Sequence, residues 1–346
     1  MATLAEIFTN IATAIRNKTG DTGKLTPIDM ISQINSLISP YAFGTLTSDT
    51  LIGKVERHYY GTSAENKYYA TLSAGYTNDT NTSLSYVVDV CDPSLTFTKF
   101  VYTDRSGMVS TATTDYLIYL AAANGSSDAS FVLNKNLTSS DIKLIYSTAV
   151  TANTISFGNY GIISNLDRVG TTLVINNDLT RSSPFSGNEN NSCHTNEYAF
   201  LITINSSSNI SYINKSLTKS YITKPVATPE TVCGANAEVA MFLGFNSSNG
   251  NLVYVKNDLT VTNLLLVPTY RYHIGTTSND YYILFGGGID NIGNSNIVDA
   301  YDANLSKVIA PVLSGGSHSL LGTHIGKFML FELCGTSSTL NNYYVI

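Results

Sequence analysis

Histidine and cysteine are the side chains of this sequence that could bind a transition metal or support redox chemistry. Cys193, His194, Cys233, His318 and His324 each stand just before an apolar run, so they could face the same end of a shared channel. The four cysteines of the chain are far apart and form no CxxC pair, which favours free thiols over a disulfide framework. Loop residues without a ligand are the favoured interpretation, and we expect neither a metal nor a cofactor.

Acid–base chemistry on a sugar needs two carboxylates within about 5 to 10 Å of each other. The chain has 25 acidic residues, yet no segment carries an unusual acidic pair. Asp92, Asp178, Asp258 and Asp302 stand in a recurring turn, where their side chains are expected to bind backbone N–H groups. No nucleophile elbow with a plausible Asp and His order is present either. The sequence therefore predicts no catalytic residue.

Glycan binding needs exposed aromatic rings beside hydroxyl and amide groups. Two segments, 56–67 and 267–280, have this composition, and their candidate ligand-binding residues are Tyr59, Tyr60, Tyr270, Arg271, Tyr272 and His273. The alternative is that half of these rings pack inside the fold, because successive strand residues point to opposite faces.

Composition narrows the classes of protein that are possible. Charged residues make up only 13% of the 346 residues, and 23 tyrosines accompany many Ser, Thr and Asn, which suits strands and turns. The net charge of −6 and the lack of a basic run argue against nucleic-acid binding. No run approaches the ~18 apolar residues of a membrane span, and the N-terminus does not read as a signal peptide. We expect no membrane insertion.

A five-residue tag, D/N-x-x-Leu-Thr/Ser, recurs after strand-like runs. Its leucines are spaced by 42, 42, 38, 42 and 46 residues, and they are Leu95, Leu137, Leu179, Leu217, Leu259 and Leu305. A second apolar run accompanies each tag, for example "DYLIYLAAA" from Asp115 and "DYYILFGGG" from Asp280. Seven units of about 40 to 48 residues are visible in this way, a period typical of propeller blades.

The repeat predicts an all-β fold: a seven-bladed β-propeller over residues 41–346. We expect each apolar run to be the innermost strand, sandwiched between neighbouring blades. The last unit stops after two strands, and its missing tag and outer strands are expected at the front of the chain, with Leu51 in the tag position. The ring would then close between N-terminal and C-terminal strands and leave no free sheet edge. A solenoid or a β-sandwich would not explain the tag and its period as well.

Residues 1–40 lack the repeat and predict a small helical hairpin. Apolar residues recur there at helical spacing on both sides of "KTGDTGK", and Pro40 marks the boundary with the propeller. A hairpin of this size cannot hold a core of its own, so it must pack on another surface. The expected attachment or oligomer interface consists of Ile7, Phe8, Ile11, Ile15, Ile31 and Ile34.

This hairpin resembles a motif of tail and baseplate-associated proteins from bacteriophages and prophages of Gram-positive bacteria. The matching residues are Ile11-Ala12, Ala14-Ile15-Arg16, Lys18-Thr19-Gly20, Leu25, Pro27, Met30 and Ile34. The stretch "ILFGGG…VDAYDANL" is similar to Kelch-type propellers, although other units lack its double glycine and the chain has no Trp. The resemblance implies a virion component that is assembled in a bacterial cytoplasm.

Taken together, these features predict a phage structural protein of the tail, baseplate or fibre. The helices would join other tail or baseplate subunits or copies of the chain in a homo-oligomer, and the propeller would face outward to bind a host surface receptor or glycan. Two alternatives stay open: a propeller hydrolase or lyase that acts on cell-surface polysaccharide, and a decoration protein of capsid or tail that binds nothing on the host.

Overall fold

A computed structural model describes most of the repeat region and four residues before it. The described residues are 9, 12–13, 26, 47–50, 62–76, 86–102, 105–123, 127–142, 153–166, 171–185, 191–202, 209–223, 230–246, 249–264, 274–290, 293–302, 304–313, 319–326, 328–334 and 339–345. The chain divides into two compact units, Met1–Gly44 and Thr45–Ile346, close to the boundary expected at residue 40.

The first unit is described at only a few positions. Thr9, Ala12 and Thr13 are helical, and the Thr13 hydroxyl donates a hydrogen bond to the Thr9 carbonyl at 2.9 Å. The six residues of the predicted interface, Ile7, Phe8, Ile11, Ile15, Ile31 and Ile34, lie outside the described residues.

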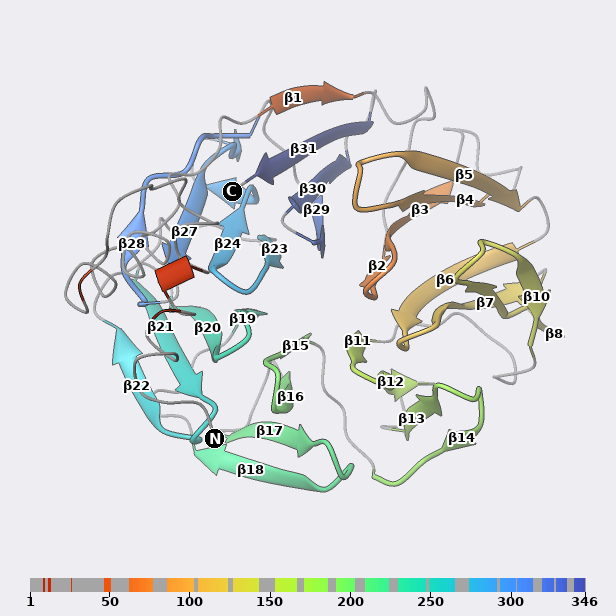
Figure 1. Cartoon of the computed structure of the whole chain (residues 1–346), viewed down its shortest axis with the longest axis horizontal. Helices are drawn as coiled ribbons and strands as arrows, with labels where there is room; N and C mark the ends of the chain where they lie inside the picture. The colour runs from red at the N-terminus through yellow and green to blue at the C-terminus, as the bar shows by residue number, and fades with distance from the viewer. Residues whose placement is uncertain are drawn as a thin grey trace. The chain divides into compact units, whose positions relative to one another are not determined.

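The second unit is an all-β propeller, which confirms the predicted fold class. Its described residues form six sheets of four antiparallel strands and one sheet in which the same four-strand meander carries a short fifth strand. Figure 1 shows these sheets arranged around a common centre. Each sheet has its first strand nearest the centre and its fourth strand at the rim.

The first strands are β2 (Thr62–Glu65), β6 (Arg105–Ala112), β11 (Asn153–Phe157), β15 (Asn191–His194), β19 (Glu230–Ala235), β23 (Gly275–Ser278) and β29 (Ser319–Ile325). The second strands are β3 (Ala70–Tyr76), β7 (Tyr116–Ala123), β12 (Tyr160–Leu166), β16 (Tyr198–Ile202), β20 (Val239–Asn246), β24 (Tyr282–Gly286) and β30 (Phe328–Cys334).

The third strands are β4 (Tyr86–Cys91), β9 (Phe131–Asn134), β13 (Thr171–Asn176), β17 (Asn209–Asn214), β21 (Asn249–Lys256), β27 (Val298–Asp302) and β31 (Thr339–Val345). The fourth strands are β5 (Phe97–Tyr102), β10 (Ser139–Asp141), β14 (Arg181–Ser182), β18 (Lys219–Thr223), β22 (Val261–Leu264), β28 (Lys307–Val308) and β1 (Thr47–Thr50). The short strands β8 (Ser127–Asp128), β25 (Ile289–Asp290) and β26 (Gly293–Asn294) complete the set, with β8 paired to β7 and β25 to β26.

The apolar runs form the second strands, so their predicted innermost position is wrong. The second strand has a neighbouring blade on each face and is buried on both, as the wholly buried β24 shows. The first strands contact one another around the axis in the closed order β2, β6, β11, β15, β19, β23, β29 and back to β2. Crowding near the axis favours small polar residues there, which explains why these segments look like loops in the sequence.

The ring closes between the two ends of the propeller unit, as predicted, but with a different division of strands. β1 pairs with β31 in antiparallel register, Thr47 opposite Tyr343. The C-terminal part supplies three strands of this sheet and the N-terminal part supplies one, where two and two were expected. Leu51 follows the fourth strand instead of preceding it, so its assignment as a tag leucine is wrong.

The tag is a tight turn between the third and fourth strands. All six tag leucines adopt a left-handed backbone, with φ from 57° to 66°, and each leucine N–H bonds the carbonyl three residues earlier at 2.8 to 2.9 Å. A left-handed leucine costs about 1 to 2 kcal/mol. Each leucine side chain packs on a core cluster, as Leu137 does, and such burial offsets that cost.

Acidic and amide side chains hold these turns, as the sequence predicted. Oδ1 of Asp92 accepts the N–H groups of Ser94 at 2.8 Å and Thr96 at 3.0 Å, and Asp302, Asn134 and Asn214 make the same pair of bonds. Asp178 and Asp258 instead accept both the N–H and the hydroxyl of the threonine two residues on. The carboxylates named in the sequence analysis are therefore structural.

Candidate functional site

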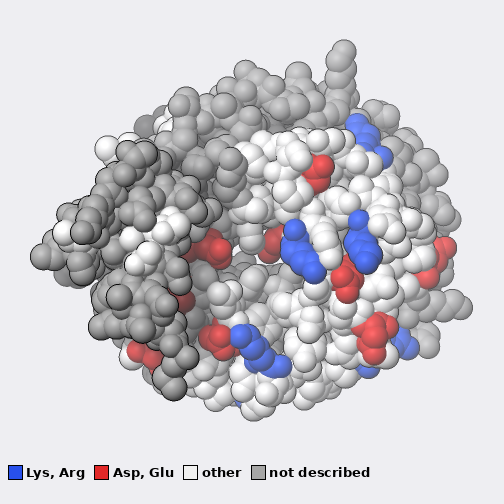
Figure 2. Space-filling view, viewed as in Figure 1, with Lys and Arg blue, Asp and Glu red and all other residues white. Residues whose placement is uncertain are grey.

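A cavity runs along the axis of the propeller. It has a volume of about 500 Å³ and is lined by residues of β2, β11, β15, β19, β23 and β29 and of the turns that follow them. Figure 2 shows the molecule hollowed near its centre, with acidic side chains beside the hollow. We call this cavity the axial channel.

The first strands end in turns capped by short polar side chains. Oδ1 of Asn66 accepts the N–H groups of Tyr68 and Tyr69 at 2.9 and 3.0 Å, and Asn236 and Asn279 repeat this arrangement. Because strands alternate in direction, these turns and the tags lie at the same end of the propeller. We call it the turn end; Glu65 and His194 stand just before it.

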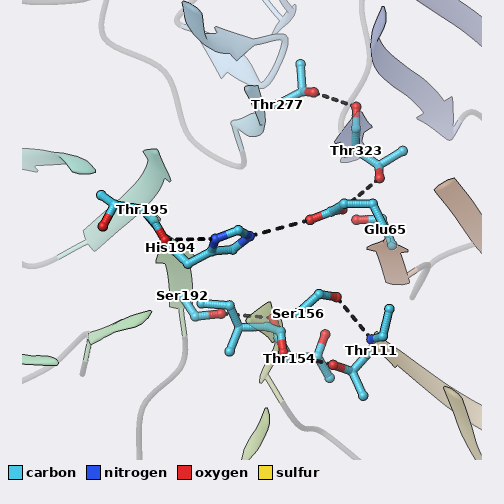
Figure 3. A network of polar contacts seen from close by, with 12 residues as sticks. Glu65, Thr111, Thr154, Ser156, Ser192, His194, Thr195, Thr277 and Thr323 are labelled. Atoms are coloured by element: carbon cyan, nitrogen blue, oxygen red, sulfur yellow. Dashed lines mark hydrogen bonds and ion pairs between the residues drawn. The ribbon is translucent and has the colours of Figure 1, made fainter. Parts of the chain in front are cut away.

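Hydroxyl groups of the first strands bind neighbouring first strands. Ser63 Oγ donates to Gly322 O at 2.7 Å, and Ser192 Oγ donates to Thr154 O at 2.9 Å. Thr111 Oγ1 donates to Ile155 O at 2.8 Å, and Thr277 Oγ1 donates to Thr323 O at 2.5 Å. Figure 3 shows the last three of these ties around the channel. First strands of different blades share no sheet, so these side chains satisfy the carbonyls that ladder bonds leave free.

Glu65 and His194 face each other near the turn end. His194 Nε2 lies 3.9 Å from Glu65 Oε1, and Thr323 Oγ1 donates to Glu65 Oε2 at 2.9 Å (Figure 3). His194 Nδ1 lies 3.2 Å from Thr195 O. Three first strands, β2, β15 and β29, thus converge on one carboxylate.

Two opposing effects act on the Glu65 carboxyl. Burial in the channel works to raise its pKa, but the bond from His194, the charges of His324 and His194 and the Thr323 hydroxyl together lower the pKa below its ordinary value of 4.5. Burial also lowers the pKa of His324, against the opposing charges of Glu65 and Asp280 and with the help of His194. The channel therefore holds an ionised carboxylate close to a neutral imidazole.

The sequence correctly indicated that Cys193, His194, Cys233 and His324 face one channel, because all four line it. His318 lies outside the described residues. Among the described parts of the chain, no three His, Cys, Asp or Glu side chains gather in a way that could hold a metal ion. Within the described residues, these four side chains do not form a metal site.

The six predicted ligand-binding residues lie outside the described residues: Tyr59, Tyr60, Tyr270, Arg271, Tyr272 and His273. Sequence reasoning missed Glu65, because its segment was taken for outer strands and a loop. The signal was available in the repeat: Glu65 stands just before the capping Asn66, as His194 stands just before Thr195.

No protein-family profile matches the chain, and no curated protein sequence matches it. Among solved structures, one similar chain is a catalytically inactive virginiamycin B lyase from Staphylococcus aureus with quinupristin. It has 12% identity and a TM-score of 0.60, and the match covers 88% of this chain and 100% of that one. Another is a lectin from Burkholderia pseudomallei, with 7% identity and a TM-score of 0.62 over 85% of this chain and 96% of that one. At these identities the likeness shows the propeller fold alone.

No described helix is long and apolar enough to cross a membrane.

Proposed function

We propose that this chain is a carbohydrate-binding propeller, carried on a bacteriophage particle and directed at a glycan of the host surface. The observation that carries the binding role is the wall of the axial channel. Hydroxyl and amide groups of the first strands surround a carboxylate there, and such groups exchange hydrogen bonds with sugar hydroxyls. A propeller of similar fold is a lectin, which supports this reading.

The particle role rests on the N-terminal segment. Its pattern from Ile11 to Ile34 resembles phage tail and baseplate proteins, and the helices would join the propeller to other subunits or to copies of the chain. If the tagged protein never co-sediments with virions from an infected or induced culture, the virion role fails while the binding role stands.

Binding is tested with the labelled full chain and cell envelopes of Gram-positive bacteria, before and after periodate oxidation of the sugars. We expect saturable binding that periodate abolishes. Glu65→Gln should weaken it on the order of ten-fold, because a charge-assisted hydrogen bond to a sugar hydroxyl is lost. Glu197→Gln is the matched control: Glu197 is an exposed glutamate that pairs with Lys215 at 2.8 Å outside the channel. Equal affinity of wild type and Glu65→Gln would remove the channel as the binding site.

A lyase acting on the same class of polymer is the second candidate. It is favoured by the ionised Glu65 beside the neutral imidazole of His324, a pair of groups with separated proton affinities. Either deprotonated group could take a proton from a sugar carbon and deliver that same proton to the leaving oxygen. Unsaturated sugar products released from purified envelope polysaccharide, and absent with Glu65→Gln, would establish it. Binding without any product over a long incubation would leave the lectin role alone.

A further inference from the structure

Two thiols of neighbouring blades approach each other in the channel wall. Cys193 lies on β15 and Cys233 on β19, two first strands in contact. The following turns are joined as well, because Asn196 N donates to Ala237 O at 2.9 Å. Both thiols are buried, at 8% and 4% exposure, belong to one core cluster and line the axial channel.

The two thiols stand on contacting strands and within one side-chain cluster. Burial raises the pKa of Cys193 well above its ordinary value of 9.0, and a hydrogen bond with Cys233 and the charge of that thiol add to the effect. Two cysteines that face one another between adjacent strands of one cluster can meet after rotation of their side chains. This geometry distinguishes the pair from an isolated buried cysteine.

We propose that Cys193 and Cys233 form a disulfide between the two blades when a small-molecule disulfide enters the channel. One protein thiolate attacks the reagent, RSSR, forms a mixed disulfide and releases RS⁻. The other protein thiolate then attacks the protein sulfur of the mixed disulfide, forms the Cys193–Cys233 bond and releases a second RS⁻. Two protons pass from the protein thiols to the two released thiolates, so the protein is oxidised by two electrons and the reagent reduced by two.

The bond would join two blades that no hydrogen-bonded sheet connects. The sheet β15–β18 and the sheet β19–β22 are separate ladders, held together by side-chain packing and by bonds between their turns. A covalent link between their first strands restrains the unfolded chain and fixes the channel wall beside His194. The link is independent of the proposed glycan.

Cys91 supplies an internal control. It is equally buried, and burial with the charge of Asp92 raises its pKa to about 12. Its thiol donates to the carbonyl oxygen of Asp92 at 3.4 Å and not to another thiol. A reaction that depended on burial alone would treat Cys91 and Cys193 alike.

The test is oxidation of the folded, reduced full chain with bis(2-hydroxyethyl) disulfide, followed by alkylation of free thiols in denaturant, trypsin digestion without reductant and mass spectrometry. We expect a linked pair of peptides, 182–215 and 220–256, that separates on reduction. The peptide carrying Cys91 should be alkylated. The reaction should be faster at about pH 9 than at about pH 7, because the thiolate is the attacking species. The oxidised protein should melt several degrees higher.

Several outcomes would overturn the proposal. One is complete alkylation of both cysteines in the folded protein after an oxidation that links them in the unfolded chain. Another is a mixed disulfide at one cysteine that never resolves. A gain in melting temperature that persists in Cys233→Ser would show that the reagent acts elsewhere. The peptide result needs no variant, so it stands even if Cys193→Ser or Cys233→Ser folds poorly.

Discussion

The tags at the turn end and the ring of first strands both repeat around the propeller, yet they repeat in opposite ways. The six tags share a left-handed leucine and a carboxylate or amide acceptor that stands either three residues or one residue before it. The last residues of the seven first strands are of six types, because only the two alanines are alike: Glu65, Ala112, Phe157, His194, Ala235, Ser278 and Ile325. A side chain that every blade keeps serves the blade itself. A polar side chain that one blade alone carries into a cavity is a candidate for function.

Substitution of Gly322 should cause the largest loss of folding stability. Gly322 is also an exception to the comparison, because it is not repeated in the ring and yet serves the fold. A Cβ on Gly322 would lie 1.7 Å from the carbonyl oxygen of Thr276 on the neighbouring first strand. Backbone cannot yield as a side-chain tip does, so Gly322→Ala should cost roughly 4 kcal/mol or more or prevent folding. Chemical unfolding of the full chain measures this cost.

The matched control is Gly158→Ala, in a turn that follows a first strand. Nothing lies within 4 Å of its Cβ, and its φ of +58° adds only a local backbone cost. We expect a loss of about 1 kcal/mol. Equal losses at the two glycines would show that the close approach of β23 and β29 does not govern the stability of the ring.

Asp302 tests the tag side of the comparison. Its Oδ1 accepts the N–H groups of Asn304 and Ser306, both at 2.9 Å, in a setting where the aspartate is 7% exposed. Asp302→Ala leaves both donors without this partner and should cost about 1 to 2 kcal/mol. Asp302→Asn keeps the acceptor, as Asn134 and Asn214 do in other tags, and should cost less than half as much. Envelope binding should be unchanged in both variants.

The comparison also explains what could be predicted from the sequence. The tag was visible because six copies carry Leu followed by Thr or Ser at nearly constant spacing, with Asp or Asn close before it. The turn chemistry of Asp92 and Asp302 follows from residue type alone. The second strands were visible as apolar runs. Their position in the strand order of the blade was predicted wrongly. An apolar run indicates that a strand is buried on both faces, but not how far it lies from the axis.

Composition does not single out Glu65, and the repeat marks only its position, just before the capping Asn66. Its role depends on β15 and β29 converging on it, and these strands lie far away in the sequence. The division of strands at the closure was missed for a similar reason. The pairing of Thr47 with Tyr343 is a contact between the two ends of the propeller unit, and no local pattern encodes which strand comes from which end.

The pH dependence of stability tests the ring of first strands. Its expected effect is smaller than those of the substitutions above. The folded-state pKa of His324 is lowered below 6.5, chiefly by burial, so below pH 6.5 the unfolded chain takes up a proton more readily than the folded one. Stability should therefore fall as pH drops from 6.5 toward the folded pKa. His324→Gln should remove this component from the difference between melting temperatures measured at several pH values.

The Glu65 carboxyl acts in a lower range with the same sign. Its folded pKa lies below 4.5, so its contribution is present above pH 4.5 and is lost as pH falls through the folded value. Glu65→Gln should weaken the pH dependence of the melting temperature below pH 4.5. The dependence near pH 6, which comes from His324, should be unchanged. A profile unchanged in both variants would mean that neither group is held in the channel as described.

The smallest expected effect belongs to the ion pair of Lys215 and Glu197 at the turn end. Lys215 is the second residue of its tag, and its Nζ lies 2.8 Å from Glu197 Oε1, with the two side chains 60% and 50% exposed. Water screens such a pair, so Lys215→Ala should change the free energy of unfolding by about 0.5 kcal/mol or less. The same tag position holds Asn177 and Asn257 in other blades, so it varies around the ring as the axial positions do, yet it does not line the axial channel. If Lys215→Ala also left envelope binding intact, variation among blades would indicate function only where it coincides with the channel; a loss of binding would extend the binding surface from the channel to the turn end.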